Sequence, residues 1–351
     1  MQAVRWHGNR DVRLEAAELA LPLGPGMVEA EVVYCGICGS DVAEYAHGPF
    51  SIRPDRDHAL TGQRPPVTLG HEFAARVTAL GSEVAGLAIG DRVSADACWR
   101  CEHCEACLAG EYNRCALSGS IGLASDGAFA PLVRFPAYCA VPLPEAVSDR
   151  AGALLEPLAV GLHALDRVHA RAGETVVVLG FGPIGACTAE VASAMGLEVI
   201  VSEPGAARRE RAAQLGYAVH EPAGERRDVA RDVRALTGGG AQIVVDASGV
   251  PAALEAAPDM TRRGGRIAVV GLPKRPPEID AARLVLYERS LVGSLGYAND
   301  LPRVASMIAA GALDPERLIT KIVPLAETAD ELRRLAEEPG GDIKVLVDVN
   351  A

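Results

Sequence analysis

Four cysteines lie close together in the segment CEHCEACLAGEYNRC. They follow the spacing C-x2-C-x2-C-x7-C and are Cys101, Cys104, Cys107 and Cys115. Four thiolates satisfy the tetrahedral coordination that zinc prefers, and four protein ligands leave no open position, so such a site is structural. A disulfide cluster or a redox CxxC pair is the alternative. Because we expect no secretory signal, the pattern favours zinc over both.

A second set of metal-binding residue types is spread over the first 156 residues. Cys38 occurs in YCGICGSD, His71 and Glu72 occur in VTLGHEF, and Glu156 opens EPLAVGLHAL. One thiolate, one imidazole and one carboxylate suit a zinc ion that keeps a position open for water or substrate. Taken singly, each residue also has a structural interpretation, as a buried cysteine, a core histidine or a helix-capping glutamate.

A glycine motif directly follows the apolar stretch TVVVL. It reads Gly180-Phe181-Gly182-Pro183-Ile184-Gly185, a G-x-G-x-x-G placed between a predicted strand and a predicted helix. In dinucleotide-binding domains the first glycine permits a tight turn, the second lets a pyrophosphate approach the backbone, and the third lets the helix pack closely. A packing turn is the alternative, but this context predicts a dinucleotide.

The end of the next predicted strand bears on the choice of dinucleotide. Glu203 lies 18 residues after Gly185. An acidic side chain there receives the ribose 2′-hydroxyl of NAD and repels the 2′-phosphate of NADP, so we expect NAD. Arg208 and Arg209 follow closely and could serve a phosphate instead.

The elements around these residues change in type along the chain. Up to about Glu156 the pattern indicates short strands, such as 28–32 and 75–79, which alternate apolar and polar residues. Beyond it, strands alternate with helices. The predicted strands are 175–179, 198–202, 242–246, 266–270 and 290–293, and the predicted helices are 184–195, 206–215 and 229–237. This alternation predicts an α/β fold with a doubly wound parallel sheet.

Composition limits the possible partners. The N-terminus MQAVRWHGNRD has no apolar h-region, so we expect no signal peptide and a cytoplasmic protein. No apolar run approaches the roughly 20 residues that span a bilayer. The net charge of −12 argues against nucleic-acid binding. Only three lysines occur, and none follows a tyrosine at i−4, so we do not expect the Tyr-x-x-x-Lys pair of short-chain dehydrogenases.

Several segments together resemble one protein family. The chain resembles the zinc-dependent medium-chain alcohol dehydrogenases, because it contains six of their segments in the same order. They are GICGSD, GHE, the four-cysteine segment, EPLAVGLHA, GFGPIG and SEP. The likeness extends over essentially the whole chain. Within that family the chain most resembles the (R,R)-2,3-butanediol dehydrogenase branch, which is similar to sorbitol and threonine dehydrogenases. The segments that carry this likeness include LTGQRPPVTLGHEF, LVGSLGY and GALDPERLIT.

The resemblance implies a division into two domains. A GroES-like catalytic domain would contain residues 1–156 and 296–351, with a structural zinc lobe at 98–115, and a Rossmann domain would contain residues 157–295. We expect a homo-oligomer, either a dimer or a tetramer.

The resemblance also implies roles for single residues. Cys38, His71 and either Glu72 or Glu156 would hold the catalytic zinc, since these two carboxylates can exchange at the metal in relatives. Ser40 would bond the alcohol oxygen and pass on its proton. We therefore expect two zinc ions and NAD, and a substrate that is a secondary alcohol. A vicinal diol is expected first, with polyols, L-threonine and larger cyclic alcohols as alternatives.

One position departs from the family pattern. Many relatives have a histidine five residues after the zinc cysteine, which carries the proton onward, but this chain has Ala43. The relay would then use ordered water, Glu44, His47 or His58. We expect residues 45–58 and 294–298 to line the substrate pocket.

Two other classes of protein share part of the pattern. A zinc hydrolase could use Cys38, His71 and Glu72, but it would not need the glycine motif or Glu203. A non-enzymatic zinc-stabilised protein would be expected to lose reactive ligands, whereas all of them are present.

Overall fold

The computed structural model describes residues 1–338 and 340–351; Pro339, inside the predicted segment 296–351, lies outside the described residues. The chain divides into two compact units. The first contains Met1–Glu156, Leu301–Gly340 and Lys344–Ala351, and the second contains Pro157–Asp300 and Gly341–Ile343.

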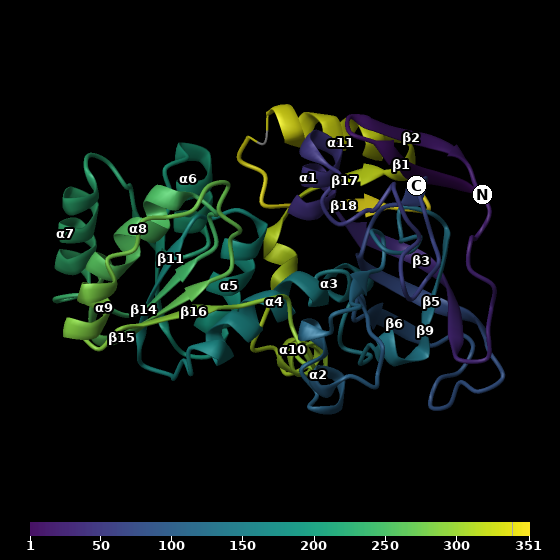
Figure 1. The fold of residues 1–351 in the computed structure, drawn as a ribbon, viewed down its shortest axis with the longest axis horizontal. Helices are drawn as coiled ribbons and strands as arrows, with labels where there is room; N and C mark the ends of the chain where they lie inside the picture. Colours follow the sequence, from purple (N-terminus) through teal and green to yellow (C-terminus); the bar gives the residue numbers. More distant parts are fainter. Residues whose placement is uncertain (339) are drawn as a thin grey trace. The chain divides into compact units, whose positions relative to one another are not determined.

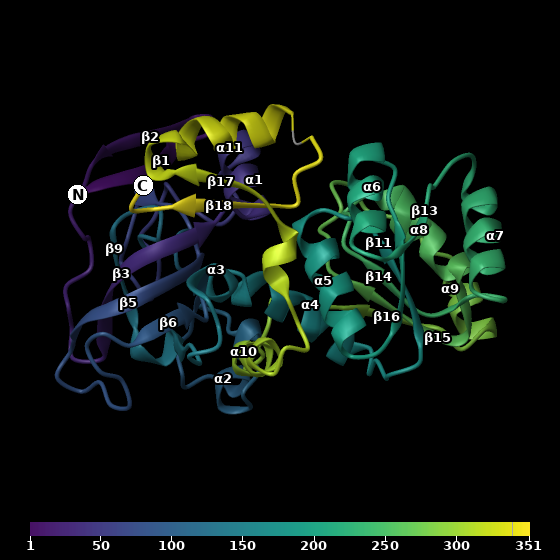
Figure 2. The same ribbon diagram turned by 180° about the vertical axis from the view of Figure 1, so that it is seen from behind.

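A mixed sheet forms the centre of the first unit. Six strands have the order β10-β6-β5-β3-β18-β17, and a seventh, β9, pairs with β3. Their bounds are β3 Met27–Gly36, β5 Glu72–Leu80, β6 Arg92–Ala95, β9 Leu132–Pro136, β10 Ala140–Pro142, β17 Ile319–Pro324 and β18 Lys344–Asp348. The C-terminal strand β18 runs antiparallel to β3 (Figure 2). The end of the chain therefore completes a sheet built by its beginning.

Smaller elements surround this sheet. A second sheet contains β1 Gln2–Gly8, β2 Asp11–Ala16 and β4 Val67–Thr68, and the strands β7 Cys98–Trp99 and β8 Gly119–Ser120 form a short pair. The α-helices are α1 Gly39–His47, α2 Glu105–Leu108, α3 Asp149–Gly152, α10 Leu301–Ala309 and α11 Thr328–Glu337, and α4 Leu155–Arg167 begins at the end of the first segment. Four 3-10 turns are η1 Tyr112–Arg114, η2 Ala137–Cys139, η3 Pro315–Leu318 and η4 Leu325–Glu327.

The alternating pattern of β3 explains its place in the core. Val28, Ala30 and Val32 are fully buried, whereas Glu31 between them is exposed. Strand residues two apart share a face, so one face of β3 joins the core. On that core Phe73 and Phe135 meet edge to face, with ring centroids 5.5 Å apart.

The second unit is built on a parallel sheet. Its strands have the order β13-β12-β11-β14-β15-β16, and all their pairings are parallel. Figure 1 labels β11, β14, β15 and β16 of this sheet. Their bounds are β11 Thr175–Leu179, β12 Glu198–Ser202, β13 Ala218–His220, β14 Ala241–Asp246, β15 Thr261–Val269 and β16 Ser290–Gly293. The helices are α5 Pro183–Ala194, α6 Ala206–Gln214, α7 Arg226–Leu236, α8 Pro251–Met260 and α9 Ala281–Leu286. The predicted α/β fold class is confirmed.

Several predicted bounds are corrected. β15 begins five residues before the predicted strand 266–270, and α7 begins three residues before the predicted helix 229–237. Residues 296–300 and Gly341–Ile343 group with the second compact unit, whereas the division that the resemblance implies assigns them to the catalytic domain; that division stays a prediction. For residues 296–300 the reason is that the Asp300 carboxylate accepts a bond from the Ala298 amide and contacts His163 Nδ1 of α4, each at 3.0 Å.

The strand order also indicates where a ligand can bind. β11 is flanked by β12 on one side and β14 on the other. The strands that follow β11 are therefore added first on one side of it and then on the other. Open parallel sheets bind ligands at such a switch point, beyond the carboxyl ends of the strands. The glycine motif begins at this end of β11.

Candidate metal and cofactor sites

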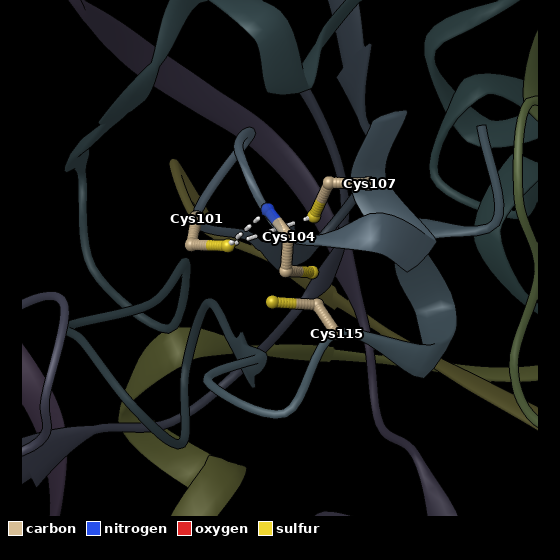
Figure 3. Close-up of side chains that lie close together, drawn as sticks. All are labelled: Cys101, Cys104, Cys107 and Cys115. Atoms are coloured by element: carbon tan, nitrogen blue, oxygen red, sulfur yellow. Dashed lines mark hydrogen bonds between the residues drawn. The ribbon is translucent and has the colours of Figure 1, made fainter. Parts of the chain in front are cut away.

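The four clustered cysteines converge. The candidate ligand atoms of Cys101, Cys104, Cys107 and Cys115 all lie within 4.8 Å of one another. Figure 3 shows the four side chains gathered from α2 and the loops beside it. The Cys101 Sγ lies 3.9 Å from the Cys107 Sγ and accepts a bond from the Cys104 amide at 3.4 Å. Cys98 lies outside this group and contacts backbone carbonyls instead.

The pKa values of two of the clustered cysteines are shifted in opposite directions. Hydrogen bonds from the backbone at His103 and Cys104 lower the pKa of Cys101 to about 6. Burial and the neighbouring Cys104 thiol raise the pKa of Cys107 to about 12. Adjacent sulfurs in one cluster cannot all be ionised without a compensating charge. The group therefore fits a zinc ion, which binds four thiolates at once.

The zinc lobe is fixed to the sheet by aromatic contacts. The Tyr112 hydroxyl donates to the Asp96 carboxylate at 2.5 Å. The Arg100 guanidinium lies over the rings of Tyr112 and Tyr138, at 4.0 and 4.2 Å from the centroids. Cation–π contacts of this kind attract the guanidinium to the ring faces, by about 0.5–1 kcal/mol at an exposed site.

A second group forms where β3 and β5 meet. The candidate ligand atoms of Cys38, His71 and Glu72 lie within 4.8 Å of one another. The register explains this, because Gly36 at the end of β3 pairs with Glu72 at the start of β5. A side chain at position 36 would collide with the Glu72 carboxylate and displace it from its present position.

A buried aspartate lies beside the histidine at ion-pair distance, without a hydrogen bond between them. Asp41 Oδ2 accepts the Cys38 amide at 3.0 Å, and Asp41 Oδ1 lies 3.6 Å from His71 Nδ1. Nδ1 faces this carboxylate, so Nε2 is the ring nitrogen that faces away from Asp41. Burial disfavours the charged imidazole, but the nearby Asp41 and Cys38 outweigh it and raise the pKa of His71 well above its usual value. Asp41 was not among the residues predicted from the sequence.

Ser40 lies against the same imidazole. Its Oγ is 3.3 Å from His71 Nε2, the nitrogen that faces away from Asp41. The hydroxyl therefore borders the group of possible metal ligands. A substrate hydroxyl held at these ligands would lie next to the Ser40 Oγ, and transfer of its proton to Ser40 requires this proximity.

The carboxylate of Glu72 is shared between a lysine and the metal group. Lys344 Nζ forms an ion pair with Glu72 Oε2 and donates to the Ile37 carbonyl at 3.2 Å. Both side chains are almost fully buried. Glu72 Oε1 is buried and has no hydrogen-bond partner, so it can serve as a ligand.

Glu156 lies near this group without joining it. Glu156 is in the first turn of α4, and its charge contributes to raising the pKa of His71. Among the described residues, the group within 4.8 Å contains Glu72 and not Glu156.

Of the side chains considered for the proton relay, Glu44 is hydrogen-bonded to backbone amides. Its buried carboxylate accepts amides from Phe50 at 3.0 Å, Ile52 at 3.2 Å and also Ser51. Glu44 therefore holds this loop in place, which disfavours a relay through it. His47 is exposed at the end of α1, and His58 is half-buried.

The glycine motif forms the predicted strand–turn–helix. Gly180 has φ +88 and packs against Ser248, so a side chain there would be strained. A side chain at Gly185 would strike the Gly180 carbonyl. α5 begins at Pro183 after the N-cap Gly182, which has no side chain to cap the first amides, and Ile184 follows within the first turn. Such a helix start is suited to phosphate.

Glu203 and the two arginines occupy different positions. Glu203 Oε2 accepts the Phe181 amide and Oε1 accepts the Gly205 amide, both at 2.7 Å. Arg209 donates to the Glu203 carbonyl at 3.0 Å and pairs with Glu221 at 2.9 Å. Arg208 Nη1 comes nearest to the space beside Gly182, and its Nε is buried without a hydrogen-bond partner. Arg208 is therefore the arginine available to a ligand.

No helix in the described part of the chain is both long and apolar enough to cross a membrane.

Two family models match the chain. Residues 24–145 match the alcohol dehydrogenase GroES-like domain, and residues 183–310 match the zinc-binding dehydrogenase domain.

Named relatives align over the full length. (R,R)-butanediol dehydrogenase of Bacillus subtilis is 33% identical over 352 residues, which cover 100% of both chains. 2-Dehydro-3-deoxy-L-galactonate 5-dehydrogenase of Pseudoalteromonas atlantica is 34% identical, covering 100% of this chain and 99% of that one. Sorbitol dehydrogenase of Bacillus subtilis is 31% identical, covering 100% and 98%.

Solved structures agree with this fold. 2R,3R-butanediol dehydrogenase from Bacillus subtilis superposes with a TM-score of 0.92 at 34% identity, covering 99% of each chain. A zinc-binding dehydrogenase from Sinorhizobium meliloti bound to NADP has a TM-score of 0.87 at 31% identity, also covering 99% of each. An Escherichia coli alcohol dehydrogenase complexed with NADH has a TM-score of 0.89 at 27% identity, covering 99% of each. The chain belongs to the zinc-binding alcohol dehydrogenase family.

Proposed function

We propose that this enzyme is an NAD- and zinc-dependent dehydrogenase that oxidises a secondary alcohol, with a vicinal diol such as (R,R)-2,3-butanediol as its substrate. The product is the hydroxyketone, and the reaction also runs in reverse. The observation that carries the proposal is the group of Cys38, His71 and Glu72, with Ser40 beside it. This group occurs in a chain that aligns with a butanediol dehydrogenase over its full length.

Two zinc ions are proposed. Cys101, Cys104, Cys107 and Cys115 would hold one, and Cys38, His71 and either Glu72 or Glu156 would hold the other. The second zinc would supply Lewis acidity at the alcohol oxygen, and the dinucleotide would accept the hydride.

The protein side chains then have separate tasks. Ser40 accepts the hydroxyl proton, because its Oγ borders the ligand group. Asp41 places a negative charge 3.6 Å from the His71 ring, and Lys344 balances the charge of Glu72. From Ser40 the proton passes to ordered water or to His47 or His58, because Ala43 cannot carry it and the Glu44 carboxylate is engaged with the loop.

The preference for NAD rests on Glu203. Its buried carboxylate is bonded to the glycine motif through the Phe181 amide, where it meets the ribose of a bound dinucleotide. In the Rossmann unit, Gly180, Gly182, Pro183, Ile184 and Gly185 would receive the pyrophosphate, and Arg208 would border it. Use of NADP is the alternative, which Arg208 and the NADP-bound relative support.

A substrate panel tests the proposal. The full chain is incubated with NAD and with (R,R)-2,3-butanediol, sorbitol, xylitol and L-threonine in turn, and with NADH and acetoin for the reverse reaction, and nicotinamide absorbance is followed. We expect the highest kcat/KM for the diol. Faster turnover of sorbitol would support the second candidate, a polyol dehydrogenase, which the full-length similarity to sorbitol dehydrogenase favours. Turnover of none of these would leave a larger cyclic secondary alcohol to test.

We also propose that the enzyme is a dimer or tetramer. β16 is an edge strand of its sheet, and Val285, Leu286 and Leu291 beside it are exposed. Exposed apolar side chains at a sheet edge favour association between copies. Light scattering after gel filtration measures the number of chains.

A further inference from the structure

The Rossmann unit contains a pocket rich in arginine. It has a volume of about 1000 Å³, and its lining includes eight arginines but only two aspartates, in a chain whose net charge is −12. The arginines come from α7, from the start of β15, from α9 and from the segment between α9 and β16. We call this the arginine pocket.

The carboxylates of the arginine pocket are already engaged. Asp259 pairs with Arg226 at 3.2 Å and also with Arg283. Over residues 1–338 and 340–351, by contrast, no ion pair involves Arg227, Arg262 or Arg263. The pocket therefore keeps positive charge that the protein does not neutralise.

Arg289 is the most enclosed of these arginines. It is 9% exposed, and two of its nitrogens donate to the carbonyls of Arg262 at 3.2 Å and Thr261 at 2.5 Å. Its Nη1 is buried with no hydrogen-bond partner. Burial lowers the pKa of Arg289, and the charges of Arg234 and Arg283 lower it further. A buried donor of this kind is costly unless an acceptor enters the pocket.

The arginine pocket lies at the other end of the sheet from the glycine motif. Arg262 and Arg263 are at the start of β15, and Arg289 directly precedes β16. Gly180 follows the carboxyl end of β11. Because all pairings in this sheet are parallel, the starts and the ends of its strands lie at opposite edges. A ligand of the arginine pocket would therefore not occupy the dinucleotide site.

We propose that the arginine pocket binds a small molecule with at least two phosphate groups. Guanidinium groups bind phosphate oxygens in pairs, and arginine is preferred where this geometry matters. The uncompensated arginines come from separate elements, so a single phosphate cannot meet them all. The volume matches that of small-molecule sites, which reach about 1,000 Å³. The overall negative charge disfavours nucleic acid as the occupant.

Calorimetric titration of the full chain with inorganic tripolyphosphate tests this proposal. Sodium chloride keeps the ionic strength constant, and parallel titrations use inorganic phosphate and ATP. We expect tripolyphosphate to bind much more tightly than phosphate, and to bind equally well when NAD is saturating. Comparable binding of ATP would identify a nucleoside polyphosphate as a possible natural source. Loss of tripolyphosphate binding in NAD would place the anion at the glycine motif and overturn the proposal.

A double variant locates the anion. Arg262→Gln with Arg263→Gln changes two exposed arginines and should weaken tripolyphosphate binding by about tenfold or more, since each removes a charge-assisted contact. Dehydrogenase activity without the anion should not change. Arg171→Gln, at an exposed site in the same unit but outside the pocket, should leave binding unaltered. Equal binding by the double variant, or no binding by the unmodified chain, would refute the site.

Discussion

Lys344 Nζ is ion-paired with the Glu72 carboxylate, although the two residues lie 272 positions apart in the sequence. Strand β18 brings them together by pairing with β3, which in turn pairs with β5. The last strand of the chain thus places a cation beside the candidate metal ligands. A buried charge of this kind requires a partner, because its desolvation is costly.

Lys344→Met should destabilise the protein by about 3–5 kcal/mol, the usual effect of removing one partner from a buried pair. Chemical denaturation measures the loss. Lys321→Met is the control, since Lys321 is 41% exposed and its buried partner Glu331 keeps a second ion pair with Arg334 at 2.6 Å, so the loss should be smaller. Equal losses in both variants would show that burial of the Lys344 pair does not matter.

The same variant addresses the choice between Glu72 and Glu156. If Glu72 is a zinc ligand, the metal compensates its charge, so the loss in Lys344→Met should be smaller with zinc than after chelation. If Glu156 is the ligand, zinc should change the loss little. Denaturation of both proteins with and without a chelator separates these results.

Each of the two metal groups should account for one zinc ion. Cys38→Ser should reduce the zinc content from two ions to one and abolish activity, with little change in the fold. Cys107→Ser should also remove one zinc but lower the melting temperature strongly, because structural zinc contributes folding free energy directly. Elemental analysis and thermal melting of the two variants measure this. One zinc or none in the unmodified chain would contradict the pairing.

The sequence predicted local features best. The strands 175–179, 198–202 and 290–293 have the predicted bounds because each is an apolar run with Gly or charged residues beside it. The short strand β13 Ala218–His220 was missed, since three residues give too little pattern to detect. The bounds of α7 and β15 differ because helix caps and sheet pairing extend an element beyond its apolar residues.

The candidate site was also predicted only in part from the sequence. Spacing alone grouped the four cysteines, but it could not predict the pairing of Gly36 with Glu72 that brings Cys38 and Glu72 together. Asp41 lies three residues after Cys38, so its position in the first turn of α1 was a usable signal. Lys344 gave none, because only the register of β18 places it beside Glu72.

Glu203→Ala should narrow the preference for NAD over NADP. The variant removes a charged acceptor for the ribose, an interaction of about 1.5–3 kcal/mol, so kcat/KM with NAD should fall by about 10- to 100-fold and that with NADP should fall less. Steady-state kinetics with both cofactors measure this. Arg208→Ala is the complementary variant, and it should reduce NADP use if Arg208 receives a phosphate. A preference of the unmodified enzyme for NADP would contradict the assignment of Glu203.

Protonation of His220 should destabilise the Rossmann unit in mild acid. Burial lowers the pKa of His220 below its usual 6.5, its Nδ1 lies 3.0 Å from Ser202 Oγ, and its Nε2 is buried without a hydrogen-bond partner. A charged imidazole would place an unsatisfied N–H at that buried nitrogen.

The sign of the effect follows from this lowered pKa. Below about pH 6.5 the imidazole of His220 binds a proton more readily in the unfolded chain than in the folded one. The free energy of unfolding therefore falls as the pH drops from about 6.5 toward the pKa of the folded state. This histidine contributes no pH dependence well above about pH 6.5. Melting temperatures between about pH 5 and pH 8 should show this loss for the unmodified protein. His220→Gln, which cannot titrate, should have a flatter curve over the same range. His7→Gln, at a half-buried histidine of the first unit, should not flatten it in the same way. Parallel curves for His220→Gln and the unmodified protein would show that other groups set the acid response.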